Sequence, residues 1–304
     1  MSKIENTLKI EKNISLAKFT TFRLGGLADF LVRIKNLKEL LAAFQFAKKN
    51  NLSFFVFSGG SNILFSDQGF RGLLIKMEND YFAFKANQLS IESGFNLAKL
   101  VNICALKGFD LSFLAGIYGS VGGAIFSNAG TSDGEISTYL KSVEIFDTKT
   151  EKRIIKTKKE LNFSYRQSIF HKKKHWIIYK ANFVFNHKKS SAEILKQIKK
   201  NLLQRNKKQP FGFSAGSFFK NPSGFSAGYL IEKSGLKGLS AGKAIISLQH
   251  GNFIINKGKA SSFDVITLAK KIYQKIKQDF SINLEPEVRI LDEQGKLIKI
   301  NENN

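Results

Sequence analysis

The sequence predicts a mixed fold of helices and strands, of the α/β or α+β class, in a chain of 304 residues. Segments with apolar residues at helical spacing alternate with short apolar runs that favour strands. Gly-rich turns separate several of these segments, an order that is typical of α/β and α+β units. A hydrophobic content of 43% excludes a chain that is disordered throughout, and a length near 300 favours about two domains.

The N-terminal block predicts one helix and two strands. Residues 37–50 carry apolar side chains at helical spacing and lysines near their end, which favours an amphipathic helix. The apolar run at residues 54–57 predicts a short strand, and a Gly-rich turn follows it at residues 58–62. Residues 73–76 predict the second strand.

The middle block begins with a predicted helix at residues 96–107, for which Gly108 is the stop signal. A second Gly-rich segment covers residues 116–130, and we expect a loop there. Three strand-like stretches follow at residues 142–146, 153–156 and 175–186. A Lys-rich amphipathic helix at residues 191–208 ends before Pro210, and we place a domain boundary near this point.

The last block starts with a Gly/Ser-rich stretch at residues 211–228. Residues 252–256 predict a strand, and residues 262–280 predict a helix. Ser261 or Ser262 would be the N-cap of that helix, because a serine hydroxyl can accept a hydrogen bond from a free N–H of the first turn.

Basic residues outnumber acidic ones by 48 to 24, which gives a formal net charge of +24. Clustered cations favour nucleic-acid binding. Only seven of the 48 are arginines, however, and the lysines are spread along the chain, whereas recognition of bases and phosphates relies on arginine. We therefore interpret most lysines as background composition and expect the charge to attract anionic small molecules rather than nucleic acid.

The single cysteine, Cys104, excludes an intramolecular disulfide and a multi-cysteine metal site, and its place on the apolar face of a predicted helix favours a buried thiol. Residues 1–16 lack the uninterrupted apolar run of a secretory signal. No stretch reaches the ~20 apolar residues that a membrane helix needs. We expect a cytoplasmic protein without a membrane partner.

Two Gly-rich segments about sixty residues apart are candidates for binding a phosphate-containing ligand. The second covers residues 116–124, and the first consists of Ser58, Gly59, Gly60, Ser61 and Asn62. Glycine lets backbone N–H groups approach a pyrophosphate closely. Neither segment has the lysine of a P-loop or opens a Rossmann unit with a fitting acidic residue, so a dinucleotide would be bound by another fold.

Ser217 lies between a glycine and two phenylalanines, with Lys220 and Asn221 three and four residues further on. The aromatic side chains would exclude water, and Lys220 would bind an anion. The serine is not in a G-x-S-x-G motif and has no histidine placed to activate it, so a hydrolase triad is poorly supported. Taken alone, the stretch is most simply a tight turn before a strand.

Glu287 and Arg289 are two residues apart in a strand-like segment, residues 284–290, so their side chains would share one face. They form either a surface ion pair or an acid and an anion-binding group in one pocket. Arg166 follows Tyr165 and adds a further scarce arginine. The four histidines have no carboxylate or cysteine partner at ligand spacing, so we predict no metal site.

Together these motifs make the chain resemble the UDP-N-acetylenolpyruvoylglucosamine reductase family of peptidoglycan synthesis. The matching motifs, in family order, are TTFRLGG (20–26), SGGSN (58–62), GIYGSVGGAIFSNAG (116–130), YRQS (165–168), GSFFKNP (216–222) and EVR (287–289). The chain departs from the usual pattern at Tyr118, where proline is common, and at residues 131–134. The short interval between Arg166 and Ser217 resembles the subtype that lacks a long substrate-covering insertion.

The resemblance implies an α+β fold of three domains. The first two would form an FAD-binding unit of the vanillyl-alcohol-oxidase (PCMH) type, at residues 1–75 and 76–208. The third, residues 209–289, would be an α+β domain that binds the UDP-sugar. The C-terminal tail, residues 290–304, is a candidate to pack against the first domain.

The resemblance also implies noncovalent FAD, NADPH as co-substrate, and the enolpyruvyl ether of UDP-N-acetylglucosamine as substrate, in a monomer. The implied catalytic residues are Ser217, Arg166 and Glu287. The implied substrate-binding residues are Lys220, Asn221, Arg289 and Tyr165. The implied FAD contacts are Ser58, Gly59, Gly60, Ser61, Asn62, Gly119, Ser120, Gly122, Gly123, Asn128 and Arg23. Two alternatives stay open: another oxidoreductase on the same FAD fold, and a Lys-rich nucleic-acid-binding module.

Overall fold

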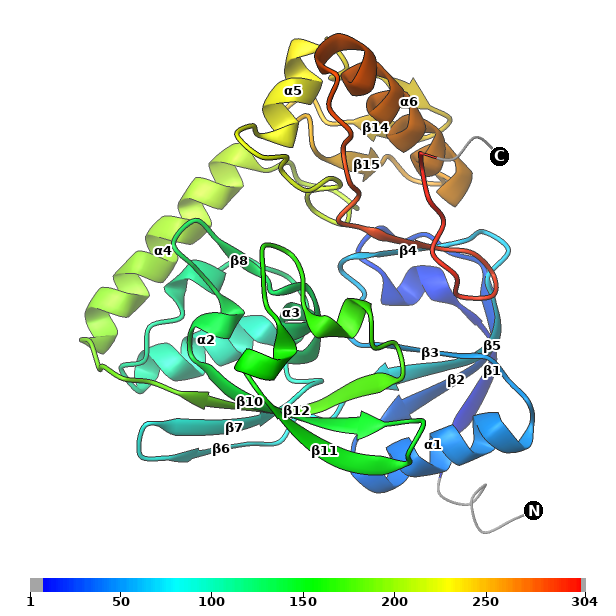
Figure 1. The fold of residues 1–304 in the computed structure, drawn as a ribbon. Coiled ribbons are helices and arrows are strands. Elements are labelled where there is room, and N and C mark those ends of the chain that lie inside the picture. The colour runs from blue at the N-terminus through cyan, green and yellow to red at the C-terminus, as the bar shows by residue number, and fades with distance from the viewer. Residues whose placement is uncertain (1–7, 302–304) are drawn as a thin grey trace.

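The computed structural model describes residues 8–301 as three units, each built on its own sheet (Figure 1). Helices and strands are mixed in all three, so the α+β class is confirmed. The predicted domain limits stay a prediction, and residues 1–7 and 302–304 lie outside the described part.

The first unit is a four-stranded sheet whose strand order is β1-β2-β5-β3. The strands are β1 (Ile10–Ser15), β2 (Leu27–Ile34), β5 (Phe70–Met77) and β3 (Phe54–Phe57). β1 is antiparallel to β2, whereas β2, β5 and β3 are parallel. Helix α1 (Leu37–Lys49) matches the predicted helix and buries Leu40 and Ala43 against this sheet. Asn36 caps α1 by accepting a hydrogen bond from the Glu39 N–H.

The second unit is a five-stranded antiparallel sheet with the order β11-β10-β12-β7-β6. Its strands are β6 (Phe82–Lys85), β7 (Gln88–Glu92), β10 (Leu140–Asp147), β11 (Lys152–Thr157) and β12 (Trp176–Val184). The helices are α2 (Leu97–Leu106), α3 (Val121–Ser127) and α4 (Ser191–Lys208). The core between sheet and helices includes stacked Phe109 and Phe185 and the buried Cys104, as expected for a core thiol.

The third unit packs two helices on a small antiparallel sheet. Its elements are α5 (Ala227–Lys233), β13 (Ser240–Ala241), β14 (Ala244–Ile246), β15 (Ile254–Asn256) and α6 (Ser262–Phe280). Ser261 is the N-cap of α6 and forms a reciprocal capping box with Asp264, so the predicted start of this helix is confirmed. Leu268 and Ile272 of α6 are fully buried against the sheet.

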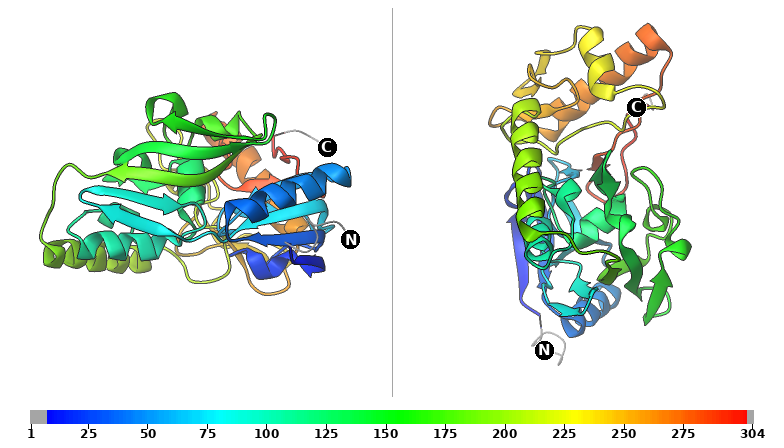
Figure 2. Two further views of the ribbon diagram at one scale, coloured as in Figure 1. Left: turned by 90° about the horizontal axis from the view of Figure 1, so that it is seen from below. Right: turned by 90° about the vertical axis from the view of Figure 1, so that its left-hand side faces the viewer.

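Two segments join the units. Strand β16 (Arg289–Leu291) pairs in parallel with β4 (Ile63–Phe65), so the chain returns from the third unit to the first (red in Figure 1). Helix α4 runs from the second unit toward the third along one edge of the molecule (Figure 2, right). A tight hairpin joins β8 (Gly130–Thr131) and β9 (Gly134–Glu135). Short 3₁₀ helices cover Leu16–Phe19, Ser112–Leu114, Ile136–Thr138, Lys159–Leu161 and Ile169–His171.

Two sequence-based expectations are wrong in detail. The Gly-rich segment at residues 116–130 is not a loop throughout, because it contains α3. Burial of Val121 and Ile125 outweighs the low helix propensity of its two glycines. The strand expected over residues 284–290 is limited to Arg289–Leu291, so Glu287 lies before the strand rather than within it. No helix among residues 8–301 combines the length and apolarity that a membrane crossing requires.

Candidate active site

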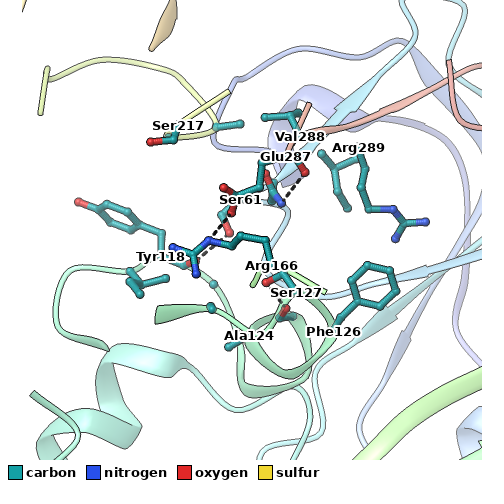
Figure 3. A pocket seen from close by; sticks show the side chains of 18 of the residues that line it. Ser61, Tyr118, Ala124, Phe126, Ser127, Arg166, Ser217, Glu287, Val288 and Arg289 are labelled. Atoms are coloured by element: carbon teal, nitrogen blue, oxygen red, sulfur yellow. Dashed lines mark hydrogen bonds and ion pairs between the residues drawn. The ribbon is translucent and has the colours of Figure 1, made fainter. Parts of the chain in front are cut away.

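A cavity of about 1990 Å³ lies where the three units meet. Its walls include Gly59 and Gly119 from the Gly-rich segments, Arg166 from the second unit, and Ser217 and Glu287 from the segments that flank the third (Figure 3). Pockets for one small ligand reach up to about 1,000 Å³. The cavity therefore has room for two ligands of that size.

The two Gly-rich segments are in direct backbone contact at one wall of this cavity. A Cβ placed on Gly59 would lie 2.6 Å from the Cα of Gly119, so any larger residue would push the two segments apart. The Ser61 hydroxyl donates a hydrogen bond to the Tyr118 carbonyl at 2.8 Å. Two loops far apart in sequence thus form one surface with little side-chain bulk, which suits close approach of a phosphate-containing ligand.

Ser120 starts helix α3 at the same wall. Its side-chain oxygen accepts a hydrogen bond from the Gly123 N–H at 3.2 Å, which fixes the first turn. Gly122 packs against Ser93, whose Cβ would lie 2.8 Å from an added Cβ. The glycines therefore let α3 begin close to the neighbouring backbone while its first turn lines the cavity.

Arg166 and Glu287 form an ion pair inside the cavity, with the Arg166 Nε 3.2 Å from the Glu287 Oε1 (Figure 3). The Arg166 guanidinium also donates hydrogen bonds to the carbonyls of Asn128 at 3.4 Å and Gly130 at 2.7 Å. Burial raises the pKa of Glu287 above its usual range, and the Arg166 and Lys220 charges counteract this only in part. The pair therefore places a positive group and a titratable carboxyl side by side in a largely buried part of the cavity.

The Ser217 segment forms the opposite wall. Among residues 8–301, the Ser217 hydroxyl makes no hydrogen bond, and Figure 3 shows it above the Arg166–Glu287 pair. The Lys220 Nζ lies 2.5 Å from the Glu285 carboxylate. The Tyr165 hydroxyl accepts a hydrogen bond from the Asn221 N–H at 3.3 Å, which links the second unit to this wall. The Ser217 hydroxyl is therefore left available to a ligand.

Arg289 faces the cavity between two aromatic rings. Its guanidinium carbon lies 4.8 Å from the ring centre of Phe55 and 4.7 Å from that of Phe126. No ion pair of the described residues includes it. Desolvation lowers the pKa of Arg289 to about 10, so the side chain stays positive at neutral pH. A cation held in this way attracts an anionic or strongly polar group of a ligand.

The structure brings together nearly all of the residues singled out from the sequence. The three expected catalytic residues and the four expected substrate-binding residues line the cavity. So do ten of the eleven expected FAD contacts, including Arg23, which lies over the Phe213 ring. The exception is Asn128, which is fully buried and binds Glu135 and the Ser164 carbonyl instead. Among residues 8–301, no group of three potential metal ligands is present.

Arg205 is a cavity residue that the sequence reasoning missed. It lies on α4, and its Cδ would be 2.6 Å from a Cβ on Gly116, so the glycine makes room for it. Burial and the nearby Arg166 charge lower the pKa of Arg205. The signal was the scarcity of arginine: Arg205 is one of only seven in the chain, and it lies in a helix whose other basic residues are all lysines.

Comparisons with known proteins agree with this architecture. The family model described as UDP-N-acetylenolpyruvoylglucosamine reductase, C-terminal domain, matches residues 204–291, and an FAD binding domain model matches residues 28–154. The UDP-N-acetylenolpyruvoylglucosamine reductase of Clostridium novyi (strain NT) is 38% identical over 97% of both chains. That of Chlamydia muridarum (strain MoPn / Nigg) is 39% identical over 95% of this chain and 96% of its own.

The fold comparison gives the same answer. The crystal structure of UDP-N-acetylenolpyruvylglucosamine reductase from Thermus caldophilus matches with a TM-score of 0.79 and 33% identity, over 93% of this chain and 99% of that one. Identity at this level over nearly the full length of both chains establishes common descent and a shared fold. The chain therefore belongs to the UDP-N-acetylenolpyruvoylglucosamine reductase family.

Proposed function

We propose that this protein reduces the enolpyruvyl ether of UDP-N-acetylglucosamine to UDP-N-acetylmuramate, a step of peptidoglycan precursor synthesis, with noncovalent FAD as cofactor and NADPH as reductant. The observation that carries the proposal is the single cavity in which the Gly-rich wall, the Arg166–Glu287 pair and Ser217 meet. Membership of the reductase family supplies the substrate class.

The residues present fit a flavin dinucleotide. The contact between Gly59 and Gly119 leaves a wall without side-chain bulk, where backbone N–H groups and the Ser61 and Asn62 side chains would hold the pyrophosphate. The unpaired Arg289 charge favours a polar or anionic group beside it. FAD supplies the hydride that no side chain can deliver, and the substrate receives it at C3 of the enolpyruvyl group.

Arg166 and Glu287 hold the substrate carboxylate in this proposal. Negative charge develops on C2 and the carboxylate when C3 receives the hydride. The Arg166 guanidinium stabilises that charge because it is already oriented by two carbonyls and one carboxyl. Burial raises the pKa of Glu287, so a second carboxylate placed beside it by the substrate would make its protonated form easier to reach.

Ser217 donates the proton to C2. A serine hydroxyl is a weak acid, but a carbanion-like carbon is basic enough to accept its proton. The hydroxyl has no hydrogen-bond partner among the described residues, so no internal bond has to break before the transfer. The neighbouring Phe218 and Phe219 are buried and limit the access of water.

The anionic and polar parts of the substrate are contacted by Lys220, Asn221, Tyr165 and Arg289. Lys220 approaches from the same segment as Ser217, and Tyr165 is joined to that segment by its bond with the Asn221 N–H. These contacts favour a UDP-sugar because its pyrophosphate and carboxylate need several cations. We further propose that the protein is a cytoplasmic monomer without a nucleic-acid or membrane partner, which light scattering and a salt titration with duplex DNA would test.

The experiment has two steps on one sample. The purified protein should show the absorbance of oxidised flavin, and NADPH should bleach it. Addition of the enolpyruvyl sugar nucleotide under anaerobic conditions should restore the flavin absorbance in stopped flow. A colourless protein that FAD cannot reconstitute would overturn the cofactor assignment. A flavoprotein that NADPH reduces but the sugar does not reoxidise would overturn the substrate assignment and favour another oxidoreductase.

A further inference from the structure

We propose that Asn128 and Glu135 are positioning residues that act through Arg166: they hold its turn and its guanidinium in the place where the substrate carboxylate binds. The inference rests on the proposed function, because it assigns Arg166 the role described above. Neither residue touches the cavity itself, since neither is among the residues that line it.

Arg166 occupies a strained position in a tight turn. Its φ is +53°, in the left-handed region that disfavours residues with a Cβ. Ser164 and Gln167 close the turn with two backbone hydrogen bonds, at 3.1 and 3.0 Å. A conformation of this kind costs about 1–3 kcal/mol and persists only where the surroundings hold it.

Asn128 holds this turn from two directions. Its side-chain amide donates a hydrogen bond to the Ser164 carbonyl at 3.0 Å, at the start of the turn. Its backbone carbonyl accepts one from the Arg166 guanidinium at 3.4 Å. One fully buried residue is therefore bonded both to the backbone that carries Arg166 and to the charged end of the Arg166 side chain.

The unpaired side-chain oxygen of Asn128 indicates that the two hydrogen bonds donated by its amide outweigh the cost of burying that oxygen. Asn128 ends α3 in the left-handed region, with φ +48°, where glycine would serve without strain. Its Oδ1 is the one buried side-chain oxygen or nitrogen among residues 8–301 without a hydrogen-bond partner. Leaving such an atom unpaired costs about 1–3 kcal/mol. Ending the helix therefore does not by itself explain an asparagine at this position, because glycine would do so without the unpaired oxygen.

Glu135 completes the arrangement. Its carboxylate accepts the second N–H of the Asn128 amide at 2.5 Å. Glu135 also pairs with Gly130 across the β8–β9 hairpin, and the Gly130 carbonyl accepts the shortest Arg166 hydrogen bond, at 2.7 Å. Both residues whose carbonyls orient the guanidinium therefore contact Glu135: Asn128 contacts its carboxylate, and Gly130 pairs with its backbone.

These contacts decide which donors remain for the substrate. A guanidinium has five N–H groups, and hydrogen bonds to the Asn128 and Gly130 carbonyls use two of them, while the Nε lies 3.2 Å from the Glu287 carboxylate. The remaining N–H groups can bind a carboxylate only if the plane of the guanidinium is held in one orientation. Displacement of a positioned group by about 1 Å can lower a rate by about 100-fold.

The test variant is Asn128→Gly. Glycine suits the left-handed end of α3 and keeps the backbone carbonyl, so only the amide and its unpaired oxygen are removed. The melting temperature and FAD content should be unchanged or higher. Flavin reduction by NADPH should be normal, whereas flavin reoxidation by the enolpyruvyl sugar nucleotide should slow by about 10- to 100-fold. Arg166→Ala gives the reoxidation rate expected when the guanidinium is absent, for comparison.

Asn162→Gly is the matched control. Asn162 is exposed, has φ +47°, ends a short helix just before the same turn, and makes no side-chain hydrogen bond among the described residues. The same substitution there should leave both half-reactions unchanged. At the other end of the contact, Glu135→Ala should resemble Asn128→Gly, while Glu135→Gln keeps an acceptor oxygen and should restore most of the rate.

Two outcomes would overturn the inference: normal reoxidation in Asn128→Gly, or equal loss of both half-reactions together with loss of FAD. A failure of the proposed function is distinguishable, because in that case the wild-type flavin would not be reoxidised by the sugar nucleotide either. Slow flavin reoxidation in Asn128→Gly, with normal reoxidation in Asn162→Gly and rescue in Glu135→Gln, would support the positioning role of Asn128 and Glu135.

Discussion

The two walls of the cavity differ in how their functional groups are held. On the wall formed by the first two units, Gly59 contacts Gly119, and two hydrogen bonds and an ion pair orient the Arg166 guanidinium. On the opposite wall, the Ser217 hydroxyl is unbonded, an added Cβ on Gly216 would meet nothing within 4 Å, and Lys220 pairs with a Glu285 side chain that is 62% exposed. One wall is organised in advance, and the other leaves groups available to a ligand.

The largest effect should come from Ser217→Ala, which removes the proposed proton donor. We expect flavin reoxidation by the sugar nucleotide to fall by about 10²- to 10⁴-fold, the range of general acid catalysis, with normal reduction by NADPH. Ser223→Ala, an exposed serine in the same segment, is the control. Normal reoxidation in stopped flow would remove Ser217 from the mechanism and leave that wall with a binding role only.

Gly59→Ala tests the organised wall. The new Cβ would lie 2.6 Å from the Gly119 Cα and 3.3 Å from the Ser120 nitrogen, so the two Gly-rich segments must separate. We expect the Kd for FAD to rise by at least about tenfold, because the backbone donors lose their spacing. Fluorescence titration of the apoprotein measures it. An unchanged Kd would mean that the contact is not part of the cofactor site.

Glu287→Gln should change the pH dependence of stability. Burial raises the folded pKa of Glu287 above its usual value, so the native state binds more protons than the unfolded state between the two values. The contribution of this group therefore becomes unfavourable as pH rises through that window. In urea unfolding, the variant should gain stability relative to wild type as pH rises above the usual pKa of a glutamate, while losing activity. If the stability difference between the variant and wild type instead shrinks as pH rises, the folded pKa of Glu287 is not raised.

The smallest effect should come from Glu285→Gln on the less organised wall. The Lys220–Glu285 pair has an exposed carboxylate, and such pairs contribute at most about 1 kcal/mol. We expect the free energy of unfolding to stay within about 0.5 kcal/mol of wild type and KM to change by less than about twofold. A large rise in KM would show that Glu285 positions Lys220, so that both walls are organised in advance.

Local sequence patterns predicted the long elements well. The helices at 37–50, 96–107, 191–208 and 262–280 were confirmed to within a residue or two at their ends, because period and capping residues are local signals. The strands in the middle block were found but are slightly different in length. Helix α3 was missed because its glycines lower the helix propensity of the segment. The helix is stabilised by burial of Val121 and Ile125, which local propensity does not report.

The motifs identified the cavity residues, but not how they are held. Asn128 was expected at the cofactor, and only the fold shows that its side chain is bonded to Glu135 and Ser164. Arg205 was overlooked because a basic residue in a Lys-rich helix looks like a solvated one. Contacts between residues that are forty to two hundred positions apart depend on chain packing, which short-range patterns do not report.

The charge of +24 also separates what the sequence determines from what the fold determines. The sequence by itself determined that arginine is scarce and lysine abundant, since composition needs no fold. Only the tertiary structure decided where these cations lie: Arg23, Arg166, Arg205 and Arg289, four of the seven arginines, line the cavity, compared with five of the 41 lysines. Planar guanidinium groups can be held by carbonyls and aromatic rings inside a protein, whereas the strongly hydrated ammonium groups of lysine stay mainly at the surface.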